Sequence, residues 1–179
     1  GSIGLSTLKI IDKKKNNFKV NILSANKNYS TILNQIKKYK PKIFFINNFE
    51  TFEKIKNKLK KKKIKILNNF ESHKSFMKSD LTISAIPGLA GLRPTISMIK
   101  NSKKILIANK ESVICGWNII KKAATINNTK IIPIDSEHFS IMKILENHNI
   151  NEIKKIIITA SGGPFLNTKV NDLNKIKPS

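Results

Sequence analysis

Short apolar runs alternate with segments of helical periodicity along almost the whole chain. The runs that predict strands cover residues 18–23, 42–46, 64–67, 81–86, 104–108, 130–134 and 153–160. The segments that predict helices cover residues 5–11, 29–39, 49–61, 71–78, 94–100, 112–125 and 136–146. Strands separated by helices of this length predict an α/β fold, a Rossmann-like, doubly wound and mainly parallel sheet with helices on both faces.

Polar clusters follow several of the predicted strands. Continuous apolar strands, such as residues 105–107 and 156–158, are typical of a sheet that is buried on both faces. In such sheets ligands bind at the carboxyl ends of the strands. The clusters at these ends are residues 26–28, 109–111, 135–138 and 161–163. We therefore expect the binding site to be built from these four clusters.

Two stretches favour a nucleotide cofactor. Gly1 and Gly4 flank the start of a predicted helix, where backbone N–H groups can approach a phosphate. Such a turn normally follows a buried strand, and the chain begins without one, so we expect the first strand of the fold to be missing from it. The strand at 18–23 leads into Asn26, Lys27 and Asn28 with no acid, which favours NADP over NAD. An ordinary polar turn remains the alternative for these three residues.

Asp135 and Glu137 follow the predicted strand at 130–134 and are separated by one residue. Two carboxylates with further coordination positions left open suit Mg²⁺ or Mn²⁺ rather than a soft metal. Alternatively, Asp135 or Ser136 only caps the next helix and Glu137 is an acid favoured by the helix dipole. These residues alone leave both interpretations open.

Composition limits the classes of protein. A chain of 179 residues with 40% hydrophobic residues can bury a sizeable core. No apolar run approaches the roughly 18 residues that span a bilayer, and the amino terminus does not resemble a signal peptide. Its single cysteine, Cys115, excludes an internal disulfide bond. We expect a bacterial-type cytoplasmic protein that binds no membrane, and a plastid-type organelle is also compatible with the sequence.

The formal charge of +23 raises the question of nucleic-acid binding. A nucleic-acid-binding protein would gather its basic residues on one face and interleave aromatic residues. Here lysine is spread over most polar positions, and asparagine and isoleucine are over-represented as well, which indicates an AT-rich genome. We expect no specific nucleic-acid partner, although a basic nucleic-acid-binding module stays the less favoured alternative. The positive field would also attract phosphorylated small molecules.

Several motifs together resemble the 1-deoxy-D-xylulose 5-phosphate reductoisomerase family. The matching stretches are Gly1-Ser2-Ile3-Gly4 with Thr7-Leu8, Gly88 with Gly91-Leu92 and Pro94-Thr95, residues 108–112, Asp135-Ser136-Glu137-His138, and residues 161–165. Their order and approximate spacing agree along the whole chain. The resemblance implies an NADPH- and divalent-metal-dependent enzyme of the non-mevalonate isoprenoid pathway. It would isomerise and reduce 1-deoxy-D-xylulose 5-phosphate to 2-C-methyl-D-erythritol 4-phosphate.

The resemblance also implies roles for the matched residues. The residues implied to bind NADPH are Gly1, Ser2, Ile3, Asn26, Lys27, Asn28, Asn109 and Glu111. Those implied in catalysis or substrate binding are Lys110, Ser136, Glu137 and Ser161. Asp135 and Glu137 would hold Mg²⁺ or Mn²⁺, with Co²⁺ also compatible. Asn26 stands where many relatives have glycine, so its match is weaker than that of Lys27.

The resemblance predicts two domains. Residues 1–134 would form the NADPH-binding domain and residues 135–179 the start of an α+β catalytic domain. Because the family has a third metal carboxylate, a substrate loop and a further helical domain beyond this point, we expect the segment alone to be inactive. The whole protein would be a homodimer that acts on a phosphorylated sugar. Another NADP-dependent oxidoreductase on the same fold remains the alternative.

Overall fold

The computed structural model describes residues 1–71, 78–158 and 165–176. The chain forms two compact units, Gly1–Asp135 and Ser136–Ser179. The first unit carries the sheets, and the second contains only helical segments and irregular chain in its described part.

Parallel strands form two three-stranded sheets in the described part of the first unit. The first sheet has the order β1 (Ile22–Ala25), β2 (Ile43–Ile46) and β3 (Lys65–Leu67). The second has the order β4 (Ser79–Ser84), β5 (Ser102–Ile107) and β6 (Lys130–Pro133). All four ladders are parallel. The predicted α/β fold with parallel strands is therefore confirmed.

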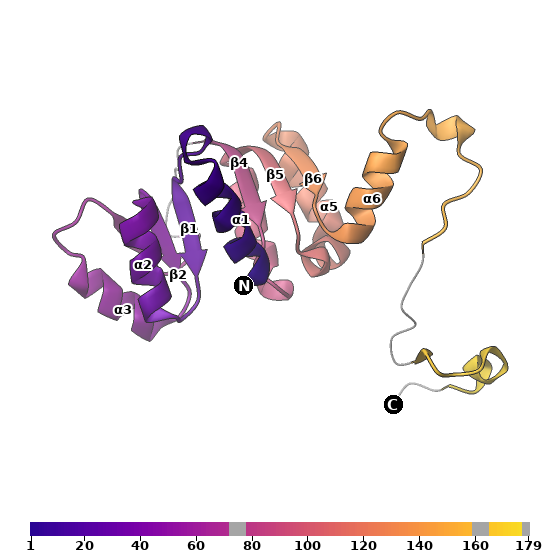
Figure 1. Ribbon diagram of the computed structural model, residues 1–179, viewed down its shortest axis with the longest axis horizontal. Helices are drawn as coiled ribbons and strands as arrows, with labels where there is room; N and C mark the ends of the chain where they lie inside the picture. The colour runs from indigo at the N-terminus through magenta and orange to yellow at the C-terminus, as the bar shows by residue number, and fades with distance from the viewer. Residues whose placement is uncertain (72–77, 159–164, 177–179) are drawn as a thin grey trace. The chain divides into compact units, whose positions relative to one another are not determined.

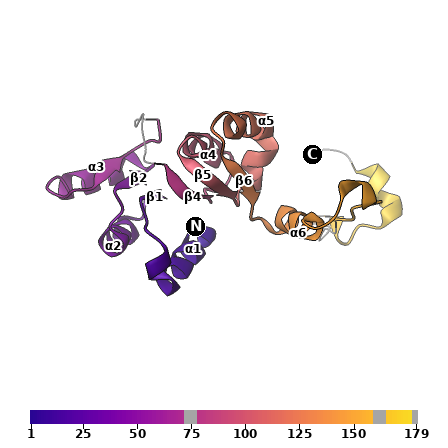
Figure 2. The same ribbon diagram turned by 90° about the horizontal axis from the view of Figure 1, so that it is seen from above.

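Four helices of the described part connect parallel strands, as such strands require. They are α2 (Tyr29–Tyr39), α3 (Phe49–Lys58), α4 (Leu92–Ile99) and α5 (Lys110–Ile126), whereas α1 (Ser2–Lys13) precedes β1. Two 3₁₀ turns, η1 (Lys15–Asn17) and η2 (Leu89–Gly91), precede β1 and α4. Seen from above, α1 and α2 lie on one side of the strands and α4 and α5 on the other (Figure 2).

The middle strand of each sheet forms the centre of a core. Around β2 the buried side chains are Ile32, Phe44, Ile46, Phe52, Ile55 and Ile66. Around β5 they are Met98, Ile99, Ile105, Ile107, Ile120 and Ala124. On the other face of β2, Phe45 stacks on Phe70 with ring centroids 3.9 Å apart. β2 can therefore be apolar at every position, because side chains pack against both of its faces, whereas β5 is apolar only in its second half, Ile105–Ile107.

A charged contact joins α1 to α2. Asp12 Oδ2 accepts hydrogen bonds from Lys38 Nζ at 2.6 Å and from the Tyr39 hydroxyl at 3.1 Å. The Asp12 side chain is only 28% exposed, and its other oxygen is buried without a partner among the described residues. This contact fixes the carboxyl-terminal ends of the two helices against each other.

Two predicted boundaries differ in the structure. The strand expected at 18–23 is β1 at Ile22–Ala25, because its pairing with β2 begins only where the Asn21 carbonyl accepts from Lys42 N at 2.9 Å. The preceding residues form η1, and Phe18 is left 42% exposed. Helix α3 ends at Lys58, so the lysine run at 60–63 lies in the turn beyond it.

The second unit contains α6 (Ser136–Leu145), η3 (Ile150–Glu152) and η5 (Val170–Lys175), and none of these elements has a buried residue. The prediction of a strand at 153–160 is wrong for its described part, because residues 153–158 have no regular secondary structure. A strand needs a neighbour for its backbone hydrogen bonds, and Ile157 is 75% exposed here. Residues 72–77, which make up most of the helix expected at 71–78, lie outside the described residues.

We predict that the stabilising effect of Asp12 is lost in acid. The hydrogen bond from Lys38 holds the pKa of Asp12 below its ordinary value, and burial opposes this only partly. A carboxyl group with a lowered folded pKa stabilises the fold above its unfolded pKa, and the effect disappears as the pH falls through the folded value. The melting temperature of Asp12→Asn should therefore fall below that of wild type near pH ~7 and converge with it as the pH falls through the folded pKa of Asp12.

Glu50→Gln provides the control for this comparison. Glu50 pairs with Lys54 at 2.6 Å within one exposed helix, where ion pairs contribute little. A melting-temperature difference between wild type and Asp12→Asn that did not change with pH would contradict the prediction.

Candidate functional site

The carboxyl ends of the strands form a polar edge. Asparagine or aspartate follows five of the six described strands within two residues: Asn26 after β1, Asn47 after β2, Asn68 after β3, Asn109 after β5 and Asp135 after β6. In Figure 1 the arrowhead of β1 and the amino end of α1 lie at the same edge. The predicted cofactor stretches at residues 1–4 and 26–28 therefore lie at one edge of the first unit.

The start of α1 offers backbone donors to solvent. Gly1 is the N-cap, and no side chain caps the helix. The first helical hydrogen bond runs from Leu5 N to Gly1 O at 3.1 Å, so the N–H groups of Ser2, Ile3 and Gly4 precede the intrahelical ladder. Added Cβ atoms at Gly1 and Gly4 would meet nothing within 4 Å, and the first turn contains no acid. These features suit a phosphate group.

Asn26, Lys27 and Asn28 form an exposed turn between β1 and α2. Asn28 caps α2, because its Oδ1 accepts hydrogen bonds from Thr31 N at 3.0 Å and Ser30 Oγ at 3.1 Å. The turn is held to the first turn of α3, since the Lys27 carbonyl accepts from Thr51 Oγ1 at 3.3 Å. Lys27 is therefore an exposed cation on a fixed backbone, which fits the 2′-phosphate of NADPH.

Asn109 is buried, whereas the two residues after it are exposed. Its side chain caps α5 by accepting from Ser112 N at 3.0 Å, and it is only 3% exposed. Its amide nitrogen donates to the carbonyls of Gly88, at 2.8 Å, and Ile86. Lys110 and Glu111 form the first turn of α5. The capping pattern, an asparagine just before a helix, was visible in the sequence, but its contacts with residues 86 and 88 were not.

The turn between β4 and α4 is held by a side-chain contact from α4 to β4 and contains a glycine of unusual backbone conformation. The Thr95 hydroxyl donates to the Gly91 carbonyl at 2.7 Å and contacts Ser84 Oγ of β4 at 2.5 Å. Thr95 is only 1% exposed, so this link is internal. Gly88 has φ +68° and ψ −173°, a conformation that is essentially limited to glycine. Sequence matching marked Gly88, Gly91 and Thr95 but gave no role to any of them.

The predicted metal ligands lie on either side of the sequence boundary between the units, Asp135 in the first and Glu137 in the second. Asp135 is half-buried and follows β6, whose ladder is extended by a hydrogen bond from Ile134 N to Ile107 O at 3.0 Å. Ser136 and Glu137 are exposed and form the start of α6. The carboxylates of Asp135 and Glu137 are hard donors suited to Mg²⁺ or Mn²⁺. Ser161, the remaining predicted substrate ligand, lies outside the described residues.

The part of the chain that the structure describes contains no cluster of three or more His, Cys, Asp or Glu side chains able to hold a metal. Two carboxylates leave several positions of an octahedral ion to other oxygen ligands. This is the usual situation for Mg²⁺, which retains water and binds substrate oxygens.

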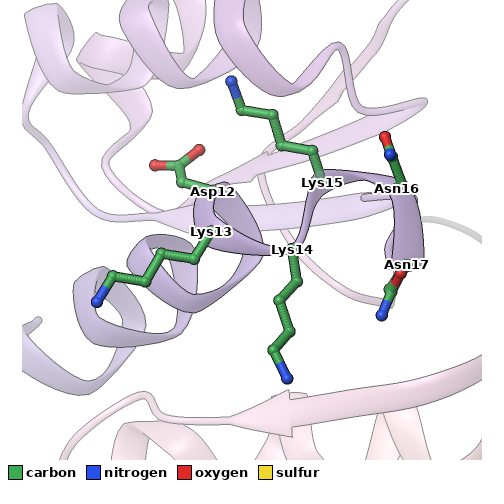
Figure 3. Close-up of a pocket in the computed structure, with 6 residues that line it drawn as sticks. All are labelled: Asp12, Lys13, Lys14, Lys15, Asn16 and Asn17. Atoms are coloured by element: carbon green, nitrogen blue, oxygen red, sulfur yellow. The ribbon is translucent and has the colours of Figure 1, made fainter.

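A shallow hollow at the end of α1 is lined by Asp12, Lys13, Lys14, Lys15, Asn16 and Asn17. Figure 3 shows that the three lysine side chains point in different directions rather than toward one point. Asp12 is already engaged with Lys38. The hollow therefore lacks the converging groups of a binding site.

Comparison with known proteins identifies the family of the chain. The family model described as 1-deoxy-D-xylulose 5-phosphate reductoisomerase matches residues 1–116. The chain belongs to this family. A second model, for the C-terminal domain of 1-deoxy-D-xylulose 5-phosphate reductoisomerase, matches residues 131–179. The family that the motifs predicted is thus confirmed.

Individual reductoisomerases are similar over nearly the whole chain. The enzyme from Pelagibacter ubique is 46% identical, with 98% of this chain and 46% of the relative aligned. The structure of the Zymomonas mobilis reductoisomerase in complex with NADPH has a TM-score of 0.83 at 31% identity, covering 98% of this chain and 47% of that one. A reductoisomerase structure with NADPH, fosmidomycin and magnesium has a TM-score of 0.78 at 28% identity, covering 98% and 47%.

The chain spans about half the length of the curated reductoisomerases it matches. Within the described residues, no helix combines the length and apolar character needed to cross a membrane.

We predict that Gly88→Ala destabilises the first unit. Alanine at φ +68° is strained, and the expected loss is about 1–3 kcal/mol of unfolding free energy. Urea unfolding of the whole protein measures this change. Gly4→Ala is the matched control, because Gly4 lies inside α1 and an added Cβ meets nothing within 4 Å. It should be neutral or stabilising by up to about 1 kcal/mol. Equal effects of the two substitutions would contradict the prediction.

Proposed function

We propose that the protein containing these residues converts 1-deoxy-D-xylulose 5-phosphate to 2-C-methyl-D-erythritol 4-phosphate, using NADPH and a divalent cation. One observation carries the proposal: in a chain of the reductoisomerase family, the implied cofactor stretches lie at the carboxyl edge of a parallel α/β unit. Ligands of such sheets bind at this edge. Relatives whose structures contain NADPH and magnesium support the choice of cofactors.

The first unit would bind NADPH. The N–H groups at the start of α1, on Ser2, Ile3 and Gly4, suit the cofactor diphosphate because the helix end is uncapped and open. Lys27, flanked by Asn26 and Asn28, would bind the 2′-phosphate. Gly1 would allow the close approach of the diphosphate to the backbone.

The matched residues after β5 and β6 would serve the cofactor, the substrate and the metal. Glu111 and the backbone at Asn109 would lie beside the cofactor, and Lys110 would supply a compact positive charge to the substrate. Ser136 and Ser161 would donate hydrogen bonds to the substrate. Asp135 and Glu137 would hold Mg²⁺ or Mn²⁺ through hard oxygen donors.

The reaction rearranges a ketose phosphate to a branched aldehyde and then reduces that aldehyde to an alcohol. When bound, NADPH supplies the hydride and the divalent cation supplies positive charge next to the substrate oxygens. The protein residues named above bind and orient these groups, and a positively charged surface attracts the phosphorylated substrate.

We also propose that residues 1–179 do not turn over the substrate by themselves and that the whole protein is a homodimer. The second unit supports the first point, because α6 and the 3₁₀ turns contain no buried residue and so lack a core of their own. Turnover by the 179-residue chain alone would contradict this proposal, and light scattering of the whole protein tests the dimer.

Substituting Lys27 tests the cofactor assignment. In the whole protein, Lys27→Ala should raise KM for NADPH by about 10–100-fold, because a charge-assisted contact with the 2′-phosphate is lost. KM for NADH, which lacks that phosphate, should change less than about twofold. Lys60→Ala, an exposed lysine in the turn after α3, is the control for general charge. An unchanged preference for NADPH in Lys27→Ala would mean that residues 26–28 are an ordinary polar turn.

Substituting Asp135 tests the reaction itself. Asp135→Asn keeps the shape of the side chain but removes a charged metal ligand. Substrate-dependent oxidation of NADPH should fall at least about 100-fold in the presence of Mg²⁺, while Kd for NADPH remains unchanged. Glu152→Gln, an exposed acid in η3, should have wild-type activity. Full activity of Asp135→Asn would instead favour an NADP-dependent oxidoreductase that needs no metal at this position.

A further inference from the structure

We propose that Asn109 is a positioning residue whose side chain clamps the turn after β4 to the start of α5, and that this side chain does not bind the cofactor. The kinetic part of the argument rests on the proposed function, whereas the structural part does not. The inference changes the role that the family resemblance implies for Asn109 and gives a reason for the glycine at position 91.

The hydrogen-bonding groups of the Asn109 side chain are already used inside the protein. An asparagine side chain has two N–H donors and one carbonyl oxygen. The nitrogen donates to Gly88 O at 2.8 Å and to Ile86 O, and the oxygen accepts from Ser112 N at 3.0 Å. The residue is 3% exposed. A cofactor contact through either N–H donor would require one of these internal bonds to break.

Gly91 provides the space that Asn109 occupies. A Cβ atom at position 91 would overlap Asn109 Nδ2 and Ile86 O, and it would lie 3.3 Å from Ser112 Oγ. Gly91 is buried, and its φ of −77° is one that any residue can adopt. Glycine is therefore required here for close approach rather than for backbone conformation.

The clamp is the last part of a continuous polar path from β4 to α5. Ser84 Oγ of β4 contacts Thr95 Oγ1 at 2.5 Å, and Thr95 donates to Gly91 O at 2.7 Å. Gly91 N in turn donates to Gly88 O at 3.1 Å, the carbonyl that also accepts from Asn109. Each of these groups is internal to the first unit, so the path fixes the turn independently of any ligand.

The clamp determines where the first turn of α5 begins. Lys110 and Glu111 directly follow Asn109, and the cap from Asn109 to Ser112 N sets the position of their backbone. A free turn at residues 86–91 would let this backbone move. Loss of the clamp should therefore lower two quantities together: kcat, because Lys110 is displaced, and the stability of the fold. Cofactor affinity should not be the only quantity that changes.

Asn109→Asp in the whole protein separates the clamp from the cap. Aspartate has the same shape and can still accept from Ser112 N, but it cannot donate to the carbonyls of residues 86 and 88. We expect kcat to fall at least about 10-fold, the melting temperature to fall, and hydrogen exchange of the Gly91 amide to accelerate. Asn109→Ser keeps a cap acceptor and loses both amide N–H donors, and its shorter side chain does not extend to the positions that Nδ2 occupies. It should change all three quantities in the same direction, and it replaces Asn109→Asp if that variant does not fold.

Two variants are matched controls. Asn48 caps α3 by accepting from Thr51 N at 2.9 Å, so Asn48→Asp makes the same chemical change at a cap without a clamp. Ser112→Ala removes a fully buried hydroxyl that has no partner among the described residues, and it keeps the N–H that Asn109 caps. Both variants should retain kcat within about twofold and wild-type exchange at Gly91.

Gly91→Ala tests the same clamp without altering Asn109. Its added methyl group occupies the position of Asn109 Nδ2, so kcat and Gly91 exchange should change as in Asn109→Asp. Wild-type exchange and kcat in Gly91→Ala would overturn the inference. So would an Asn109→Asp protein that shows only weaker NADPH binding, with unchanged melting temperature and unchanged exchange. If the wild-type protein does not act on the substrate, exchange and melting temperature still decide the clamp.

Discussion

Parallel pairing of strands that are buried on both faces is the constraint on which the rest of the first unit depends. β2 and β5 each lie between two parallel neighbours and carry the fully buried residues Phe44, Ile46 and Ile105. Because the neighbours run in the same direction, every chain segment leaves its sheet at one edge. The buried strands therefore determine that the polar residues which follow them lie at this edge.

At that edge the backbone is fixed by asparagine caps. Asn28, Asn48 and Asn109 each follow a strand and accept a hydrogen bond from the first turn of the next helix. Asn109 differs from the other two because it is buried and its amide nitrogen also donates to two carbonyls of another turn. The same residue type thus caps a helix locally at Asn28 and Asn48, which are not buried, and joins two segments of the fold at the buried Asn109.

The described apolar residues of the second unit are not buried in a core of their own. They have the pattern of a strand and an amphipathic helix, yet Ile144, Ile157 and Val170 are largely exposed. Secondary structure in residues 153–158 depends on a neighbouring strand, which no other described segment of this chain provides. Helix α6 forms nevertheless, since its hydrogen bonds are internal to the segment.

The sequence by itself determined the features that depend on local spacing. The bounds of α2, the buried strands β2 and β5, and the order of the family motifs were all readable from periodicity and residue type. Only the tertiary structure decided which polar residues are internal, because a side chain becomes buried when segments far apart in the chain pack together. Asp12 meets Lys38, and Asn109 meets residues 86 and 88, through contacts that no local pattern encodes. For the same reason the strand predicted at 153–160 did not form in its described part: hydrophobicity favours a strand, but only a paired neighbour satisfies its backbone.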